Sequence, residues 1–308
     1  MKKNRIIVCC EYNELVDSII SQILERKSDL ELLGIISING LPNNEKKTKS
    51  LFLGYKHDII ENNNPDVDLI LLVGYPLILP ESIINKYKCI NSHASLLPQY
   101  RGFHSTGWAL INNEQYVGYT IHIAETTFDT GSILYQHKIK TSNMTTFGII
   151  KDSIIDDMKK RFVPVIIDYL NNKIKPQTQS IDTLPKISSK RSISDCLINW
   201  EQKTSFIERF IRALLPPQAP GAFTIFKNKK LIITKANVYN CAPYYGTPGK
   251  VLLISGKKIL IKTQDTALWV DRVIYDQIEQ DASDVINNIG HFLGIDLKSL
   301  KLKELDIT

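Results

Sequence analysis

The stretch CINSHASLLPQYRG, residues 89–102, holds the pattern that decides the fold of this chain. It begins as a short apolar strand and then places two polar residues, Asn91 and His93, where a buried strand should end. Residues two apart in an extended chain share one face, so both side chains can address the same ligand. Open α/β sheets bind their ligands at the carboxyl edge of the strands. The stretch therefore predicts a site at such an edge.

Three earlier apolar runs predict the rest of the sheet. They are RIIVCC (5–10), LELLGIISI (30–38) and VDLILLVGY (67–75). The segment NELVDSIISQILERK (13–27) has apolar residues at helical spacing and predicts a crossover helix after the first strand. Strands that alternate with helices indicate a doubly wound, mostly parallel, Rossmann-like α/β sheet. CCEYNEL stands where a dinucleotide-binding GxGxxG would follow the first strand, so NAD-dependent chemistry is not expected.

The second half of the chain predicts a separate, smaller domain. A long helical pattern covers 145–171, with Pro164 as a kink or a break, and a polar, proline-containing linker covers 171–192. Beyond it, SFIERFIRALL (205–215) is an amphipathic helix, and short strands separated by Gly and Asn turns follow. We therefore expect a catalytic domain over 1–187 and a C-terminal domain over 188–308, consisting of a linker helix and a small, β-rich, barrel-like fold.

Composition sets wide limits on function. The 308 residues are 43% apolar and 23% charged, and the formal charge of +6 suits a small anionic substrate about as well as nucleic acid. Five cysteines without CxxC spacing indicate reduced thiols rather than disulfides or a zinc site. The N-terminal apolar run is too short for a signal peptide, and no apolar stretch approaches the ~20 residues of a membrane span. A cytoplasmic protein without a membrane partner is expected.

A second motif follows in VGYTIHIAETTFDTGSILYQHKI (117–139), where Asp129, Thr130 and Gly131 occupy a turn between two strand-like runs. Together with Asn-x-His and Ser-Leu-Leu-Pro in the first stretch, this pattern resembles the N10-formyltetrahydrofolate-dependent formyltransferases. The resemblance extends over about residues 67–270 and includes LINWEQKTSFIERFIRALLPPQAPGAFTIFKNKKLIITKA. It implies a formyltransferase fold and N10-formyltetrahydrofolate as co-substrate, with no metal.

The resemblance also implies catalytic roles for Asn91, His93 and Asp129. An amine attacks the formyl carbon, and the resulting oxyanion needs hydrogen-bond donors already in place, which the Asn91 amide and the His93 imidazole can supply. One such donor is typically worth ~3 kcal/mol in the barrier. Asp129 is expected to favour the protonated imidazolium of His93, because a neighbouring negative charge raises a histidine pKa. Whether His93 or Asp129 is the base stays open.

Binding residues follow from the same resemblance. LLVGYPLILPESII (71–84) is similar to the segment that binds the pterin, so the apolar wall of the folate pocket is assigned to Tyr75, Pro76, Leu77, Ile78 and Leu79. The acceptor substrate is expected to meet Arg101, Gly102 and His104. His122 is expected to serve packing rather than chemistry. Lys46, Lys47 and Lys49 are expected to be a solvated loop.

Two acceptors remain open. Methionyl-tRNA formyltransferases carry a long basic insertion after the second strand, where this chain has only NGLPNNEKKTKS (39–50). The sugar-acting branch resembles RGFHSTGWALINNE, and also KRSISDCLINW, which contains Arg191 and Asp195. We therefore favour a nucleotide-linked amino sugar, carried by UDP or dTDP, for surface polysaccharide synthesis. Initiator tRNA is the alternative, and a binding module without turnover is a third hypothesis that the intact triad opposes. A homodimer stays open.

Overall fold

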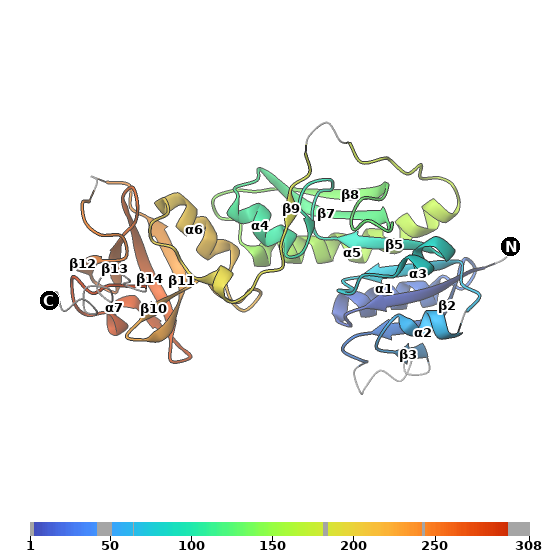
Figure 1. Cartoon of the computed structure of the whole chain (residues 1–308), viewed down its shortest axis with the longest axis horizontal. Coiled ribbons are helices and arrows are strands. Elements are labelled where there is room, and N and C mark those ends of the chain that lie inside the picture. Colours follow the sequence, from blue (N-terminus) through green and yellow to red (C-terminus); the bar gives the residue numbers. More distant parts are fainter. Residues whose placement is uncertain (1–2, 42–50, 64, 181–183, 242–243, 295–308) are drawn as a thin grey trace. The chain divides into compact units, whose positions relative to one another are not determined.

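The computed structural model describes residues 3–41, 51–63, 65–180, 184–241 and 244–294. These form two compact units (Figure 1). The first unit comprises Met1–Thr106, Tyr116–Lys140 and Ile150–Ser189. The second comprises Gly107–Gln115, Thr141–Ile149 and Lys190–Thr308. The domain boundary after residue 187 stays a prediction.

The main sheet of the first unit has seven strands in the order β3-β2-β1-β4-β5-β7-β8. Neighbouring strands from β3 through β5 pair in parallel, and β7 and β8 complete the sheet as antiparallel strands. The strands are β1 (Asn4–Cys10), β2 (Leu30–Ser37), β3 (Phe52–Gly54), β4 (Leu69–Val73), β5 (Lys88–His93), β7 (Tyr116–Ile123) and β8 (Ile133–Lys140). This is the mostly parallel sheet that the sequence predicts.

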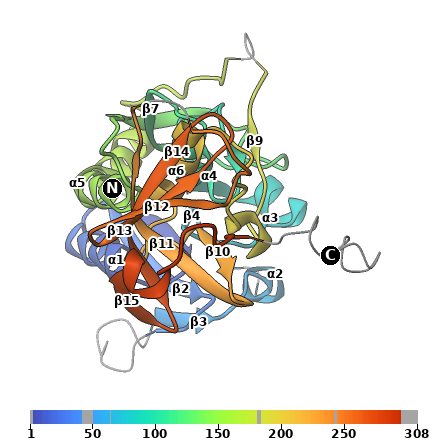
Figure 2. The same cartoon turned by 90° about the vertical axis from the view of Figure 1, so that its left-hand side faces the viewer.

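Helices cover both faces of this sheet. They are α1 (Glu14–Glu25), α2 (Asp58–Asn63), α3 (Glu81–Lys86) and α5 (Phe147–Leu170), whereas α4 (Ser105–Ile111) begins in this unit and continues into the second. Figure 2 shows α1 and α5 on one side of the sheet and α2 and α3 on the other. Gln22 of α1 donates to the Lys159 carbonyl of α5 at 2.7 Å, which joins the two helices of one layer. On the other face, Ile60 and Ile83 pack with Cys9 in one apolar cluster.

Local chemistry explains where α1 begins and why α5 continues. The side chain of Asn13 caps α1 by accepting hydrogen bonds from the backbone N–H groups of Leu15 and Val16. Helix α5 is continuous through Pro164, so the chain does not break there. Phe162 and Ile166 on either side of the proline are buried, and their packing holds the helix together where one backbone hydrogen bond is missing.

A short parallel pair, β6 (Arg101–Gly102) with β9 (Ile187–Ser188), fastens the segment after α5 to the first unit. The backbone N–H of Arg101 donates to the Lys186 carbonyl at 3.0 Å, and that of Phe103 donates to the Ser188 carbonyl at 3.0 Å. The predicted linker is therefore a structured part of the first unit at this point.

The second unit is built on an antiparallel sheet of six strands, in the order β10-β11-β14-β13-β12, with β15 paired to β14. These are β10 (Phe223–Phe226), β11 (Lys229–Val238), β12 (Val251–Ser255), β13 (Lys258–Lys262), β14 (Ala267–Tyr275) and β15 (Ile278–Asp281). Its helices are η2 (Ser194–Cys196), α6 (Thr204–Ala213) and α7 (Ala282–Val285). Buried Ile207, Phe210 and Ile211 line one side of α6, as expected of an amphipathic helix. The predicted β-rich C-terminal domain is confirmed.

Within the described residues, no helix is long and apolar enough to cross a membrane.

Candidate active site

Strand β5 carries the two polar residues Asn91 and His93. Asn91 pairs with Leu72 of the parallel neighbour β4 and with His122 of the antiparallel neighbour β7. His93 ends the strand and is 8% exposed. Both residues lie at the carboxyl edge of the parallel strands, where ligands bind in this architecture. The position predicted for them from the sequence agrees with the structure.

Asp129 reaches the same place from the turn between β7 and β8. Its Oδ1 lies 3.4 Å from the amide nitrogen of Asn91, and its Oδ2 lies 3.3 Å from Nδ1 of His93. Asp129 has φ 56°, a left-handed conformation that costs a non-glycine residue on the order of 1–3 kcal/mol. A Cβ on Gly131 would lie 1.9 Å from the Ile123 carbonyl oxygen, so the turn needs glycine there. The structure thus brings the three predicted catalytic residues together.

The hydrogen bonds of His93 determine where its proton sits. Nε2 lies 2.9 Å from the backbone carbonyl oxygen of Tyr100, which only accepts, so Nε2 carries hydrogen. The hydroxyl of Ser105 lies 3.3 Å from the same nitrogen. In the neutral ring, Nδ1 therefore presents its lone pair to the Asp129 carboxylate. Two acceptors that face each other can hold one proton between them.

His122 belongs to this cluster as well, which the sequence analysis did not foresee. It is 1% exposed, and its Nδ1 lies 2.8 Å from its neighbour's carbonyl oxygen at Ile123, so Nδ1 is the donor. Its Nε2 is then free to accept from the amide of Asn91 at 3.2 Å. Both polar contacts of the Asn91 amide are longer than the usual 2.9–3.0 Å for such bonds, so its hydrogens are held weakly.

Burial sets the charge state of the site. It lowers the pKa of His93 below the ordinary value, and it outweighs the Asp129 carboxylate and the Tyr100 carbonyl, which favour the charged ring. The Asp129 carboxylate raises the pKa of His93, as expected from the sequence, but by less than burial lowers it. Burial alone would raise the pKa of Asp129, but His122, His93 and the Gly102 N–H together bring it below its ordinary value. Near neutral pH the pair is a neutral imidazole beside a carboxylate.

The glycine that ends the stretch 89–102, Gly102, contacts the catalytic cluster through its backbone. Its backbone N–H donates to Oδ2 of Asp129 at 2.9 Å. Its φ is 103°, and a Cβ there would lie 2.4 Å from the Ser188 carbonyl oxygen. Only glycine can bring its N–H to the aspartate in this conformation.

These side chains line a cavity of about 380 Å³ in the first unit. All five residues assigned to the folate wall, from Tyr75 to Leu79, line it, and so do Gly102 and His104. Tyr75 is held by His57, whose Nδ1 lies 3.0 Å from the tyrosine hydroxyl, and burial raises the pKa of Tyr75 to about 12. Ile78 is 67% exposed, so the wall offers apolar surface to a ligand.

The charge of the cavity lining is negative. Among the described residues that line it, none is lysine or arginine, whereas Glu125 and Asp129 are both acidic. Such a lining suits an entering ammonium group and gives phosphate groups no cationic partner inside the cavity. Phosphates of an acceptor would therefore be bound elsewhere.

Other residues singled out in the sequence lie outside this lining. Arg101 is not among the described residues of the cavity wall, and its Nη2 donates to Gln179 at 2.7 Å. Lys46, Lys47 and Lys49 fall outside the described residues. In the second unit, Arg191 lies over the Trp108 ring at 4.9 Å, and Asp195 accepts from the hydroxyl of Ser192 at 2.7 Å.

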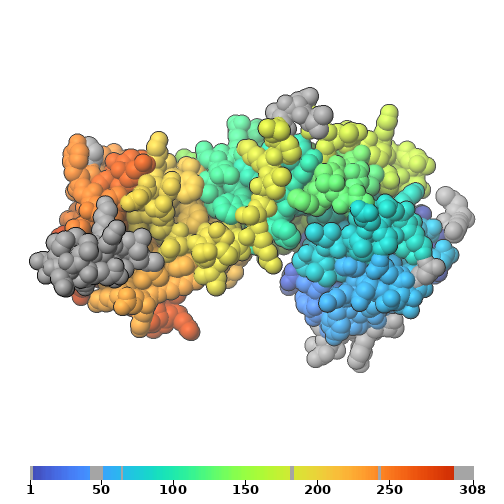
Figure 3. Space-filling view, in the orientation of Figure 1, coloured from blue at the N-terminus to red at the C-terminus, as the bar shows by residue number. Residues whose placement is uncertain are grey.

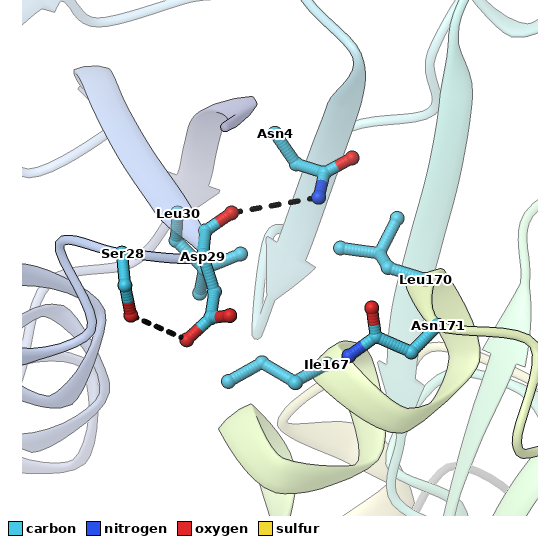
Figure 4. Close-up of a pocket in the computed structure, with 7 residues that line it drawn as sticks. All are labelled: Asn4, Ser28, Asp29, Leu30, Ile167, Leu170 and Asn171. Carbon is cyan, nitrogen blue, oxygen red and sulfur yellow. Dashed lines mark hydrogen bonds between the residues drawn. The ribbon is translucent and has the colours of Figure 1, made fainter. Parts of the chain in front are cut away.

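The first unit has a second, much smaller cavity. It has a volume of about 30 Å³ and lies where the end of α5 meets the starts of β1 and β2 (Figure 4). Asn4 donates to the Asp29 carbonyl across it at 3.4 Å. The space has room for about one or two water molecules and is too small for a folate or a sugar.

Comparison with known proteins agrees with this geometry. The family model Formyl transferase matches residues 44–166, and Formyl transferase, C-terminal domain, matches residues 191–290. The methionyl-tRNA formyltransferase of Clostridium tetani is 30% identical over 208 residues, which cover 67% of this chain and 66% of the relative. That of Fusobacterium nucleatum subsp. nucleatum is 33% identical over 245 residues, 77% of this chain and 76% of the relative.

A solved structure shares the fold. The sugar N-formyltransferase from Shewanella sp. superimposes with a TM-score of 0.61 at 18% identity, over 75% of this chain and 97% of that one. The two family models together span more than half of the sequence. The protein described here therefore belongs to the formyl transferase family.

Proposed function

We propose that the protein transfers a formyl group from N10-formyltetrahydrofolate to the primary amine of a nucleotide-linked amino sugar. Formyl transfer follows from the family, and the acceptor is the proposed part. The observation that carries the chemistry is the cluster of Asn91, His93 and Asp129 at one cavity, with His93 Nδ1 and Asp129 Oδ2 3.3 Å apart.

In this proposal, Asn91 stabilises the oxyanion. As the amine attacks, its nitrogen forms a bond to the formyl carbon and the carbonyl electron pair moves to oxygen. The Asn91 amide, held by long bonds to His122 and Asp129, can turn one N–H towards this oxygen. A donor that strengthens its bond only in the transition state lowers the barrier.

The His93–Asp129 pair holds the proton in transit. The attacking nitrogen becomes positively charged and must lose a proton before the intermediate collapses. The neutral Nδ1 of His93 faces the carboxylate and can share that proton with it. When the bond between the formyl carbon and N10 of the folate breaks, N10 takes up the proton, so the pair ends as it began.

The acceptor assignment rests on the absence of lysine and arginine from the described lining of the cavity, and on the short segment after β2. The sequence between β2 and β3 is short, and its lysines are Lys46, Lys47 and Lys49. Because phosphate contacts supply most of the affinity for nucleic acid, a tRNA acceptor needs a larger basic surface than a nucleotide diphosphate does. The short segment therefore supports the sugar.

One observation favours the second candidate, initiator tRNA. Both curated relatives described above, at 30% and 33% identity, are methionyl-tRNA formyltransferases. Measured activity on both acceptors, the amino sugar and initiator tRNA, decides between them.

The test is formyl transfer to a panel of UDP- and dTDP-linked 3- and 4-amino sugars, set beside charged initiator tRNA. Turnover on one sugar and none on tRNA is the expected result, with a rate that changes little with salt. If tRNA alone is formylated, and activity falls steeply between about 50 mM and 200 mM salt, the sugar assignment is wrong. If no acceptor in the panel is formylated, the proposed formyl transfer is itself wrong.

The charge state of His93 makes a separate prediction. Because burial lowers its pKa, the ring should stay neutral at pH 7 and titrate with a midpoint below its ordinary value of 6.5. The neutral ring contributes stability that is fully present above pH 6.5 and is lost as the pH falls from there through the lowered pKa of the folded protein. Histidine ring resonances followed by NMR from about pH 8 to about pH 5 give the midpoint, with His93→Gln to assign the signal. A midpoint above 6.5 would contradict the neutral ring.

A further inference from the structure

Gln179 is a buried glutamine behind the candidate site, in the segment that follows α5. Figures 1 and 3 show this segment along the outside of the first unit. The residue is 5% exposed. Its side-chain nitrogen donates to the backbone carbonyls of Asp129 and Gly131, each at 2.8 Å. Its side-chain oxygen accepts from Nη2 of Arg101 at 2.7 Å.

These partners fix the orientation of the amide. Carbonyl oxygens only accept and guanidinium groups only donate, so the nitrogen must face the turn and the oxygen must face Arg101. Both hydrogens of the amide are therefore used on the two carbonyls that flank Thr130. A buried amide satisfied in this way is rigid, because any rotation leaves polar groups without partners in a low dielectric.

The turn that Gln179 holds needs an external support. Asp129 adopts a left-handed conformation at φ 56°, which such a residue keeps only where its surroundings impose it. The bonds from Gln179 reach the carbonyls on both sides of this turn at short distances. They hold the backbone so that the Asp129 carboxylate points towards His93.

Gln179 also joins the turn to the strand that contacts the carboxylate directly. Arg101 precedes Gly102, and the Gly102 N–H donates to Oδ2 of Asp129 at 2.9 Å. The Arg101 side chain is tied to Gln179, so one glutamine connects the backbone of the turn with the segment that binds its side chain. The carboxylate is fixed from both directions.

We infer that Gln179 is a positioning residue that sets the place of the Asp129 carboxylate against His93. It touches neither the cavity nor the reacting atoms, and it acts through Asp129. The inference rests on the proposed role of Asp129 in catalysis.

Two variants test it. Gln179→Glu keeps the shape and an oxygen for Arg101 but loses both donors, and Gln179→Met keeps the volume but loses all three bonds. A displacement of about 1 Å can reduce a rate by about 100-fold, so we expect kcat to fall by about that factor in both, with much smaller changes in KM. Gln177→Glu is the matched control: its side chain is exposed and its pairing with Ile133 is through backbone only, so it should retain the wild-type rate.

A second readout separates positioning from a general structural role. The Asp129 carboxylate raises the pKa of His93 against the effect of burial. If Gln179→Met moves that carboxylate away, the His93 midpoint measured by NMR should fall further, whereas a loss of stability alone would leave it unchanged.

The outcomes are distinct. Wild-type kcat with an unchanged His93 midpoint in Gln179→Met would overturn the inference, and so would a Gln179→Glu variant that keeps full activity, because it lacks both donors. Should Gln179→Met fail to fold, the isosteric Gln179→Glu carries the test, with circular dichroism melting to show that it is folded. If Asp129→Asn itself has wild-type activity, the proposed function fails, and with it the basis for Gln179.

Discussion

Replacing Asp129 with asparagine should lower kcat by about 1000-fold, within the range that general acid–base groups contribute. The substitution keeps the shape of the side chain, and an amide oxygen can still accept the Gly102 N–H that now reaches Oδ2 at 2.9 Å. What is lost is the negative charge beside His93 Nδ1. A neutral amide cannot stabilise the imidazolium that forms when His93 Nδ1 takes the proton of the attacking amine, so the imidazole is left as a much poorer proton acceptor.

Formyl transfer followed by absorbance of the folate product measures this loss. Asp168→Asn is a matched control, since this aspartate lies in α5 with 44% of its side chain exposed, in an ion pair with Lys173. It should retain the wild-type rate. An Asp129→Asn enzyme within about tenfold of wild type would mean that the pair is not the proton carrier.

The first part of the site could be predicted because it is local. Asn91 and His93 lie two apart at the end of an apolar run, and alternation in a strand places both on one face. The carboxyl edge of a parallel sheet then gives their position. Asp129 was predicted only through the resemblance to a family. It lies 38 residues from Asn91 in the chain, and that spacing alone does not indicate that the two are close in space.

His122 and Gln179 could not be predicted, for two physical reasons. His122 meets Asn91 only because β7 pairs antiparallel with β5 in a register that sets these residues opposite each other. An alternating apolar strand such as YTIHI does not reveal its register. Gln179 lies 50 residues from Asp129 in a polar segment that composition marks as a linker, and this segment is paired to β8 by the backbone bridge between Ile133 and Gln177.

Arg101 makes a contact inside the protein that its place beside the motif does not reveal. An arginine beside a catalytic motif suggests a substrate contact, and that role stays a prediction. In the structure its guanidinium donates to Gln179, which gives it a second task inside the protein. An Arg101 variant would therefore mix two effects, whereas Gln179 variants isolate one.

Replacing Asn91 with alanine should lower kcat by a factor of about 100 to 1000, the loss that follows removal of one oxyanion donor. The proposed interaction forms only when the carbonyl oxygen becomes negative. The amide is occupied at rest by His122 and Asp129, at 3.2 Å and 3.4 Å, so it contributes little to binding the donor in its ground state. Such a loss should appear equally in kcat and in kcat/KM, with KM unchanged.

This equality separates the oxyanion role from a role in binding. If Asn91 held the folate, alanine would raise KM and leave kcat nearly intact. Asn63→Ala is a suitable control, since Asn63 lies at the exposed end of α2 and donates to the Ile59 carbonyl of its own helix. His93→Ala should lose at least as much activity as Asn91→Ala, because it removes a proton acceptor along with the ring that Asp129 faces. A wild-type kcat in Asn91→Ala, with KM raised, would assign this residue to binding and leave the oxyanion to another donor.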